Sequence, residues 1–208
     1  MAEVPETRYA RNGDVSLAYH VFGEGPVLVG IPPFAQNIEM AWENSRCRRM
    51  LTAFGSFSRF VHFDKRGTGM SDPSVEVASM DERVDDLRAV LDAAGVERAV
   101  LIGESEGGPI AIVFAATFPD RTSGLVLMAS TATFVPRGDD HPWGVLPEPE
   151  WLGAFLAHWG TSESITLERF APSLAGDSAF RHWWSRYERH SASPAALRMN
   201  AISADTRA

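Results

Sequence analysis

The most constraining feature of this sequence is the segment Gly-Glu-Ser-Glu-Gly-Gly-Pro at positions 103–109. An apolar run over residues 99–102 precedes it, and an apolar helical pattern begins at Glu106. Glycines on both sides of a serine let a strand turn sharply into a helix, because larger side chains would collide there. Such a turn projects the Ser105 hydroxyl above the sheet at a helix N-terminus, whose dipole favours negative charge. This context predicts that Ser105 is a catalytic nucleophile; the alternative is a purely structural turn.

Short apolar runs alternate with helical patterns over the first 130 residues. Residues 80–94 place their apolar side chains on one stripe, and Gly95 follows where a helix C-terminal cap is expected. A second helical pattern covers residues 110–118 and ends before Pro119. The predicted strands cover residues 15–22, 27–31, 59–63, 99–102 and 124–128. This alternation predicts an α/β fold with a mostly parallel sheet and helices on both faces.

The composition changes after Ser130. Few β-branched aliphatic residues remain there, and no pattern typical of a buried strand is present. Helical patterns cover residues 150–159, 178–189 and 194–201. Most tryptophans of the chain lie in this part: Trp143, Trp151, Trp159, Trp183 and Trp184. We therefore expect two parts, an α/β core over residues 1–130 and a helical, tryptophan-rich cap over residues 131–208.

Charge and composition limit the function classes. The formal net charge of −8 argues against a nucleic-acid surface, because phosphate binding needs concentrated Lys and Arg. Cys47 is the only cysteine, so it cannot form an internal disulfide or a cysteine metal cluster. The longest apolar stretches are too short to cross a bilayer, and the N-terminus lacks a signal-peptide pattern. We expect a cytoplasmic protein that uses no cofactor and no metal and binds neither nucleic acid nor membrane.

Two further segments point to the same family as the serine turn. Residues 64–71 read Asp-Lys-Arg-Gly-Thr-Gly-Met-Ser, and residues 31–36 read Ile-Pro-Pro-Phe-Ala-Gln. Together with the turn, they resemble the α/β-hydrolase family of serine esterases and lipases, in which such loops follow strands four and three. The resemblance implies an α/β-hydrolase fold with a helical cap, and loop-shaping roles for Asp64 and Arg66. The N-terminal part more specifically resembles bacterial hydrolase domains that occur alone or ahead of a nucleotide-cyclase domain.

The resemblance also implies an oxyanion hole. Acyl transfer to a serine passes through a tetrahedral oxyanion, which two backbone N–H groups stabilise. One donor follows the nucleophile, here Glu106, and the other lies in the loop after strand three. Because Pro32 and Pro33 have no N–H, Phe34 is the expected second donor. The alternative for Phe34 is an aromatic side chain that packs beneath the cap.

The acid and the histidine of a catalytic triad are not found. In the family they follow strands seven and eight, and no such strands are predicted after Ser130. We therefore expect a chain that ends before these strands, as a truncated member of the family would. Six histidines occur in other contexts, where packing or surface roles are expected: His20, His62, His141, His158, His182 and His190. Asp139 and Asp140 are expected in a solvated loop, and Glu104 and Glu106 are expected to tune the helix start rather than to act as bases.

The function predicted from these features is hydrolysis of a carboxylic ester or related small acyl substrate through an acyl-enzyme on Ser105. The alternative is a catalytically incomplete fragment, or a binding or sensing domain that retains the turn without the triad. Perhydrolysis or C–C bond cleavage with the same triad is a closer variant. An aspartate-nucleophile mechanism is disfavoured because Ser105 occupies the nucleophile position. The strand at residues 124–128 would form a sheet edge, so we also expect aggregation or self-association through it.

Overall fold

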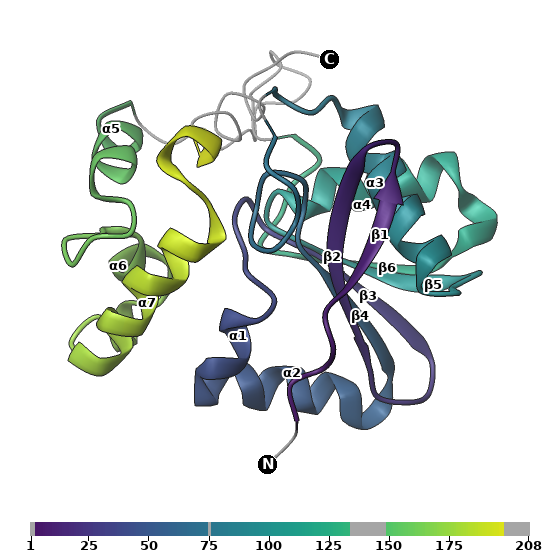
Figure 1. The fold of residues 1–208 in the computed structure, drawn as a ribbon, viewed down its shortest axis with the longest axis horizontal. Helices are drawn as coiled ribbons and strands as arrows, with labels where there is room; N and C mark the ends of the chain where they lie inside the picture. The colour runs from purple at the N-terminus through teal and green to yellow at the C-terminus, as the bar shows by residue number, and fades with distance from the viewer. Residues whose placement is uncertain (1–2, 75, 134–148, 198–208) are drawn as a thin grey trace.

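The computed structural model describes residues 3–74, 76–133 and 149–197, and it has an α/β architecture (Figure 1). Its six strands form one sheet in the order β1-β2-β4-β3-β5-β6. The pairs β1–β2 and β2–β4 are antiparallel, and the pairs β3–β4, β3–β5 and β5–β6 are parallel. The strands are β1 (Arg8–Asn12), β2 (Val15–Phe22), β3 (Val27–Ile31), β4 (Arg59–Phe63), β5 (Ala99–Glu104) and β6 (Thr122–Met128). The predicted fold class is confirmed.

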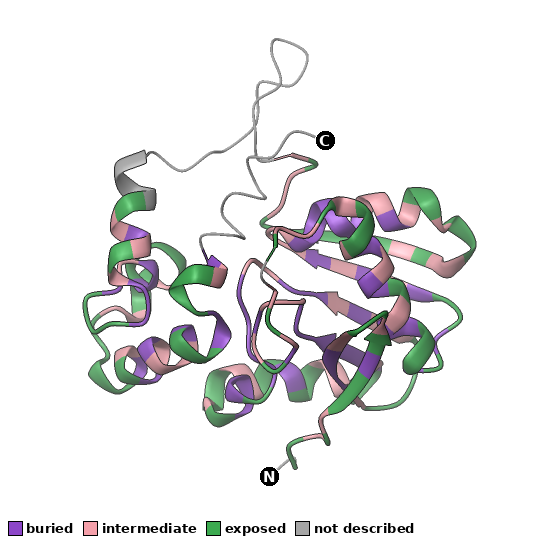
Figure 2. Ribbon diagram, turned by 45° about the horizontal axis from the view of Figure 1, so that its top comes forward, coloured by how far each residue is buried: buried purple, intermediate pink, exposed green. Residues whose placement is uncertain are grey.

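Helices cover both faces of the sheet, as the sequence predicts. The α-helices between strands are α1 (Met40–Glu43), α2 (Ser45–Phe57), α3 (Met80–Ala93) and α4 (Gly107–Thr117), and a 3-10 turn, η1 (Pro119–Arg121), precedes β6. On one face, α3 and α4 pack against the larger core, in which Val29, Val61 and Leu101 are fully buried. On the other face, α1 and α2 enclose a second core around Trp42 and Phe60. Figure 2 shows these buried segments at the centre of the layers.

Helix α3 follows the predicted pattern closely. The Ser79 hydroxyl accepts from the Glu82 N–H, and the Glu82 carboxylate accepts from the Ser79 N–H, which completes a capping box. The apolar stripe of the helix is buried against the sheet. The helix ends at Ala93, one residue before the predicted end, because Gly95 then adopts a φ of +64°.

The helices between β3 and β4 were not among the predicted elements. The Asn44 side chain caps α2 by accepting hydrogen bonds from the N–H groups of Arg46 and Cys47. Helix α2 then presents Cys47, Leu51 and Phe54 to the second core at helical spacing. An asparagine followed by apolar residues at this spacing predicts a helix. The pattern is weak here because several arginines and small residues lie between the apolar positions.

The part of the chain after β6 is helical where the structure describes it. It contains α5 (Pro149–His158), α6 (Thr166–Phe170), the 3-10 turn η2 (Pro172–Leu174) and α7 (Ser178–Ser191). These elements form a group beside the sheet (Figure 1). Helices α5 and α7 match two predicted helices, while α6 was not predicted. Of the third predicted helix, residues 194–197 are helical and the remainder lies outside the described residues, as do Trp143 and the side chain of Trp151.

Strand β6 is one of the two outermost strands of the described sheet, at the edge opposite β1. It starts two residues before the predicted strand and pairs with β5. Four consecutive apolar side chains on it are between 40% and 48% exposed: Leu125, Val126, Leu127 and Met128. Within the described ranges, no helix has both the length and the apolar character needed to cross a bilayer.

Candidate functional site

Ser105 lies at the junction of β5 and α4, as the sequence predicts. Its backbone has a φ of +48°, in the left-handed region that non-glycine residues rarely adopt. Strand β6 and a residue shortly after it hold Ser105 through its N–H and its carbonyl group. The Ser105 N–H donates to the carbonyl oxygen of Met128 at 3.0 Å, and the Ser130 hydroxyl donates to the carbonyl oxygen of Ser105 at 2.5 Å. These hydrogen bonds stabilise a backbone conformation that would otherwise be unfavourable.

Close backbone packing explains the glycines around Ser105. A Cβ atom at Gly103 would lie 2.7 Å from the Cα of Gly108, within the turn itself. A Cβ atom at Gly107 would lie 2.3 Å from the carbonyl oxygen of Ile31, at the end of β3. The start of α4 therefore lies directly against the loop that follows β3. The predicted nucleophile and the loop with the second predicted N–H donor are adjacent in the fold.

Side chains of the loop after β3 anchor it to backbone carbonyl groups of β4 and α7. The Gln36 amide donates to the carbonyl oxygen of Phe63 at 2.9 Å, and the Asn37 amide donates to the carbonyl oxygen of His190 at 3.0 Å. The Phe34 ring packs against Phe155 and Trp159 of α5, with ring centroids 5.5 and 5.7 Å away. The predicted packing of this ring against the C-terminal helices is thus observed. It concerns the ring, while the predicted oxyanion role concerns the Phe34 backbone N–H, so the two do not compete.

Asp64 and Arg66 shape the loop after β4. The buried Asp64 carboxylate accepts hydrogen bonds from the N–H groups of Ile38 and Met70, at 3.1 and 2.9 Å, and so ties two loops together. Burial raises the pKa of this carboxyl group to about 7, although these hydrogen bonds oppose the rise. Gly69 is required because a Cβ there would lie 2.0 Å from the Asp64 carboxylate. Arg66 forms a two-pronged ion pair with Asp86 of α3.

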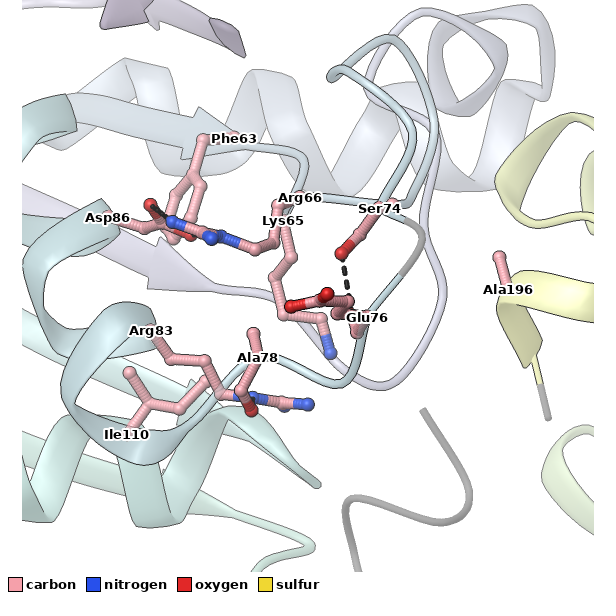
Figure 3. Close-up of a pocket in the computed structure, with 11 residues that line it drawn as sticks. Phe63, Lys65, Arg66, Ser74, Glu76, Ala78, Arg83, Asp86, Ile110 and Ala196 are labelled. Atoms are coloured by element: carbon pink, nitrogen blue, oxygen red, sulfur yellow. Dashed lines mark hydrogen bonds and ion pairs between the residues drawn. The ribbon is translucent and has the colours of Figure 1, made fainter. Parts of the chain in front are cut away.

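A buried ionic cluster lies under the serine turn, and sequence reasoning did not find it. The Glu106 carboxylate accepts from Lys65 Nζ at 2.8 Å and also from the Arg83 guanidinium of α3. Burial alone would raise the pKa of Glu106, but the two cations hold it below its usual value. Lys65 and Arg83 also line a small cleft together with Glu76, and Ser105 is not among its lining residues (Figure 3).

Glu104, on the other side of Ser105, lies in a different environment. Burial raises the pKa of its carboxyl group. Ser105 Oγ has no hydrogen bond to an imidazole or a carboxylate among residues 3–74, 76–133 and 149–197. No group of three or more histidine, cysteine or acidic side chains within the same ranges is arranged to hold a metal ion.

The histidines are distributed over distant elements. His20 and His62 lie opposite each other on β2 and β4, and both are buried. Burial lowers the pKa of His20 to about 4 and that of His62 to about 3. His158 is on α5, and α7 carries the next two along the chain, while His141 lies outside the described residues. The structure thus shows a nucleophile-like serine without a base bonded to it in the described part of the chain.

Comparison with known proteins identifies the family. A family model described as alpha/beta hydrolase fold matches residues 48–194, which is more than half of the chain. The chain belongs to the alpha/beta hydrolase fold family. This agrees with the strand order, with the serine turn between β5 and α4, and with the resemblance seen in the sequence. Several proteins similar to this alpha/beta hydrolase chain are named as hydrolases, and another is named as a synthase.

Three relatives illustrate the range of similarity. The 2-hydroxymuconate semialdehyde hydrolase of Pseudomonas sp. (strain CF600) is 36% identical over 110 residues, which is 51% of this chain and 38% of that protein. A 2-hydroxy-6-oxononadienedioate/2-hydroxy-6-oxononatrienedioate hydrolase of Paraburkholderia phymatum is 38% identical over 109 residues, which is 51% of this chain and 33% of that protein. The solved structure of Est816, an N-acyl homoserine lactone degrading enzyme, superposes with a TM-score of 0.66 at 27% identity and covers 96% of this chain and 71% of that one.

The matched segment spans less than half of the length of such curated relatives, between 33% and 47% for the proteins compared. The similarity therefore supports the family and the fold of this chain. Substrates named for the relatives are properties of those proteins.

Proposed function

We propose that this chain carries the nucleophile of a serine hydrolase that acts on a carboxylic ester or a related small acyl compound. One observation carries the proposal: Ser105 is held at a φ of +48° between a parallel strand and a helix N-terminus. Strain of this kind is unfavourable, and it persists where the surrounding structure over-determines it, most often at functional sites. Three glycines and two hydrogen bonds to β6 and Ser130 maintain it here.

In the proposed reaction, Ser105 Oγ attacks the acyl carbon and forms a tetrahedral intermediate. The proton of the hydroxyl passes to a general base, and the leaving group departs with a proton. The N–H groups of Glu106 and Phe34 are the proposed donors to the oxyanion. This role is supported by the close approach of Gly107 to the carbonyl oxygen of Ile31, which brings the loop after β3 against the turn. Water then hydrolyses the acyl-enzyme.

The alternative function is a catalytically incomplete hydrolase-like domain that binds a ligand without turnover. It is supported by the lack of a bonded base at Ser105 in the described part of the chain. C–C bond hydrolysis is a second candidate reaction, because two of the relatives are hydrolases of oxo-dienoate compounds. Covalent trapping separates turnover chemistry from binding, and product analysis separates the two hydrolytic reactions.

The division into a core (residues 1–130) and a helical cap (131–208) also remains a proposal. It is supported by the apolar clusters of the C-terminal helices: Phe155 and Trp159 form one with Ala35, and Phe180 and Trp183 form another. We further propose that a second copy of the chain pairs with β6. An outermost strand with apolar side chains offers both unpaired backbone groups and apolar area to an identical strand.

A fluorophosphonate probe tests the proposed nucleophile. We expect Ser105 of the wild-type chain to react, and Ser105→Ala to abolish labelling while the thermal unfolding of the chain is unchanged. Labelling without a complete triad is expected to be slow, since the oxyanion hole and binding alone supply about 10³-fold over water. Mass spectrometry of the labelled peptide identifies the site. Ser123→Ala serves as a matched control, because it removes an exposed serine hydroxyl of β6 but leaves Ser105 and its hydrogen bonds. Equal labelling of Ser105→Ala and the wild type would overturn the assignment.

A further inference from the structure

The Glu106 carboxylate is enclosed by two cations from separate elements. Lys65 comes from the loop after β4 and Arg83 from α3, and both contact the carboxylate directly. The three side chains are between 8% and 12% exposed, so water screens them poorly. With both cations protonated, the three side chains carry one net positive charge; burial lowers the pKa of the Lys65 ammonium, and the Glu106 carboxylate opposes that shift.

Burying such a charged cluster is energetically unfavourable, so its position beside the serine turn suggests a role other than stability. Removing charged groups from water is unfavourable, and apolar residues of similar volume would often serve stability as well or better. The cluster is attached to the residue that directly follows Ser105, and that residue is the N-terminal cap of α4. Its side chain therefore ties the orientation of the Glu106 peptide to the loop after β4 and to α3.

We propose that Lys65 and Arg83 are positioning residues that hold the Glu106 N–H toward the developing oxyanion and supply net positive charge beside Ser105. This inference rests on the proposed function, because it names what supports the oxyanion site of the same nucleophile. Preorganised charge of this kind stabilises an anion without reorganisation during the reaction. Anionic groups of acyl compounds and tetrahedral intermediates would be favoured at this position.

Other charged groups lie near the turn, and Glu76 lines the same cleft as Lys65 and Arg83. Glu104 precedes Ser105, and burial raises the pKa of its carboxyl group, which favours the uncharged form. Asp86 is paired with Arg66 through two hydrogen bonds of 2.7 Å. The proposed effect is therefore assigned to Lys65, Arg83 and Glu106.

A thiol at position 105 can report the local charge without a catalytic base. In a Cys47→Ala background, Ser105→Cys introduces one thiol, and the pH dependence of its alkylation by uncharged iodoacetamide gives its pKa. Lys65→Met removes a positive charge and is expected to raise the thiol pKa by about 1, a tenfold loss of thiolate at neutral pH. Glu106→Gln removes the negative charge and is expected to lower the thiol pKa by about the same amount. Lys65→Arg is expected to retain the original value.

Opposite shifts from two variants separate a charge effect from loss of structure, since general loosening of the turn would move both variants in the same direction. Arg88→Met is the matched control: it removes one positive charge from the same helix as Arg83, but its side chain is 46% exposed and screened by water. It should leave the thiol pKa unchanged. Cooperative thermal unfolding of each variant confirms that it is folded, and Glu106→Gln alone decides the sign if Lys65→Met does not fold.

The outcomes distinguish this inference from the proposed function. A thiol pKa that stays constant in Lys65→Met and in Glu106→Gln overturns the inference, while fluorophosphonate labelling of Ser105 still supports the hydrolase. A thiol that iodoacetamide does not reach in the folded chain overturns both, because position 105 would then be closed to substrates. Labelling that survives Ser105→Ala overturns the proposed function whatever the thiol reports.

Discussion

The two neighbouring strands β5 and β6 have similar apolar sequences but different surroundings. Strand β5 lies between β3 and β6, and alternate residues along it are buried, with Leu101 fully enclosed. Strand β6 pairs with β5 on one side, and Val126 is 48% exposed. Where β5 ends, two hydrogen bonds hold the Ser105 backbone, and the backbone packs closely at Gly103 and Gly107. Apolar runs of the same kind can therefore build a rigid site or an exposed edge, depending on sheet order.

Of the substitutions that compare the two regions, Gly107→Ala should destabilise the chain most. Gly107→Ala places a methyl group 2.3 Å from the carbonyl oxygen of Ile31, so we expect a loss of about 4 kcal/mol in the free energy of unfolding. Gly124→Ala on β6 is the control, because its methyl group would meet Val100 at an ordinary 3.5 Å. Its effect should stay below about 1 kcal/mol. Urea unfolding measures both, and equal losses would contradict the contrast between the enclosed turn and the open strand.

The stability of the enclosed part of the sheet should depend on pH, whereas β6 contributes nothing to this dependence because it has no titratable side chain. His20 and His62 have pKa values lowered to about 4 and about 3, so the unfolded chain binds more protons below pH 6.5 and stability falls as the pH falls. Asp64, with a pKa raised to about 7, acts in the opposite direction between pH 7 and 4. The two histidines destabilise the chain more than the single carboxyl group stabilises it. The free energy of unfolding should therefore fall by about 3 kcal/mol between pH 6.5 and 4.

Asp64→Asn provides the control for this pH dependence. It removes the opposing contribution, so the loss of stability with acid should become steeper in the variant. Urea unfolding at several pH values measures both slopes. A stability that does not change between pH 6.5 and 4 in both proteins would show that the histidines keep ordinary pKa values.

The exposed edge can be tested by adding a charge. Val126→Lys should weaken self-association at least tenfold, which is about 1.4 kcal/mol, because a lysine on an edge strand opposes pairing with another strand. Size-exclusion chromatography with light scattering over a range of concentrations measures this. Tyr9→Lys on β1 is the matched control: Tyr9 is 50% exposed at the opposite edge, which already carries Arg8 and Arg11. A wild-type chain that stays monomeric at high concentration would refute the proposed pairing.

The smallest effect is expected where the two regions meet. Ala129 follows β6 with a φ of +49°, and glycine adopts this conformation more easily than alanine. Replacing Ala129 by glycine removes about 1 kcal/mol of backbone strain from the folded chain. The greater conformational entropy of glycine in the unfolded chain offsets part of this gain. We therefore expect Ala129→Gly to stabilise the chain by about 0.5 kcal/mol, measured by urea unfolding. Marked destabilisation would mean that the alanine methyl group makes contacts that outweigh its strain.

Much of the fold could be predicted because its signals are local. The apolar runs at β3 and β4 have the predicted bounds, and the capping box at Ser79 marks the start of α3. The serine turn was predicted at Ser105, where the left-handed backbone is now observed. Helices α2 and α6 were missed because they are short or broken by charged residues, and packing against the sheet and α7 supplies the stability that their sequences alone do not indicate.

By itself, the sequence determined the strand–turn–helix unit around Ser105 and the α/β class, because glycine positions and hydrophobic periodicity act over a few residues. Only the tertiary structure decided that Lys65 and Arg83 both contact Glu106. In the chain, Lys65 is 41 positions and Arg83 is 23 positions away from Glu106. The edge position of β6 was expected from the sequence, but only the structure decided its register on β5, which leaves Leu125 and Val126 exposed. Both outcomes depend on the order of strands in the sheet, which brings distant segments together and which no local pattern encodes.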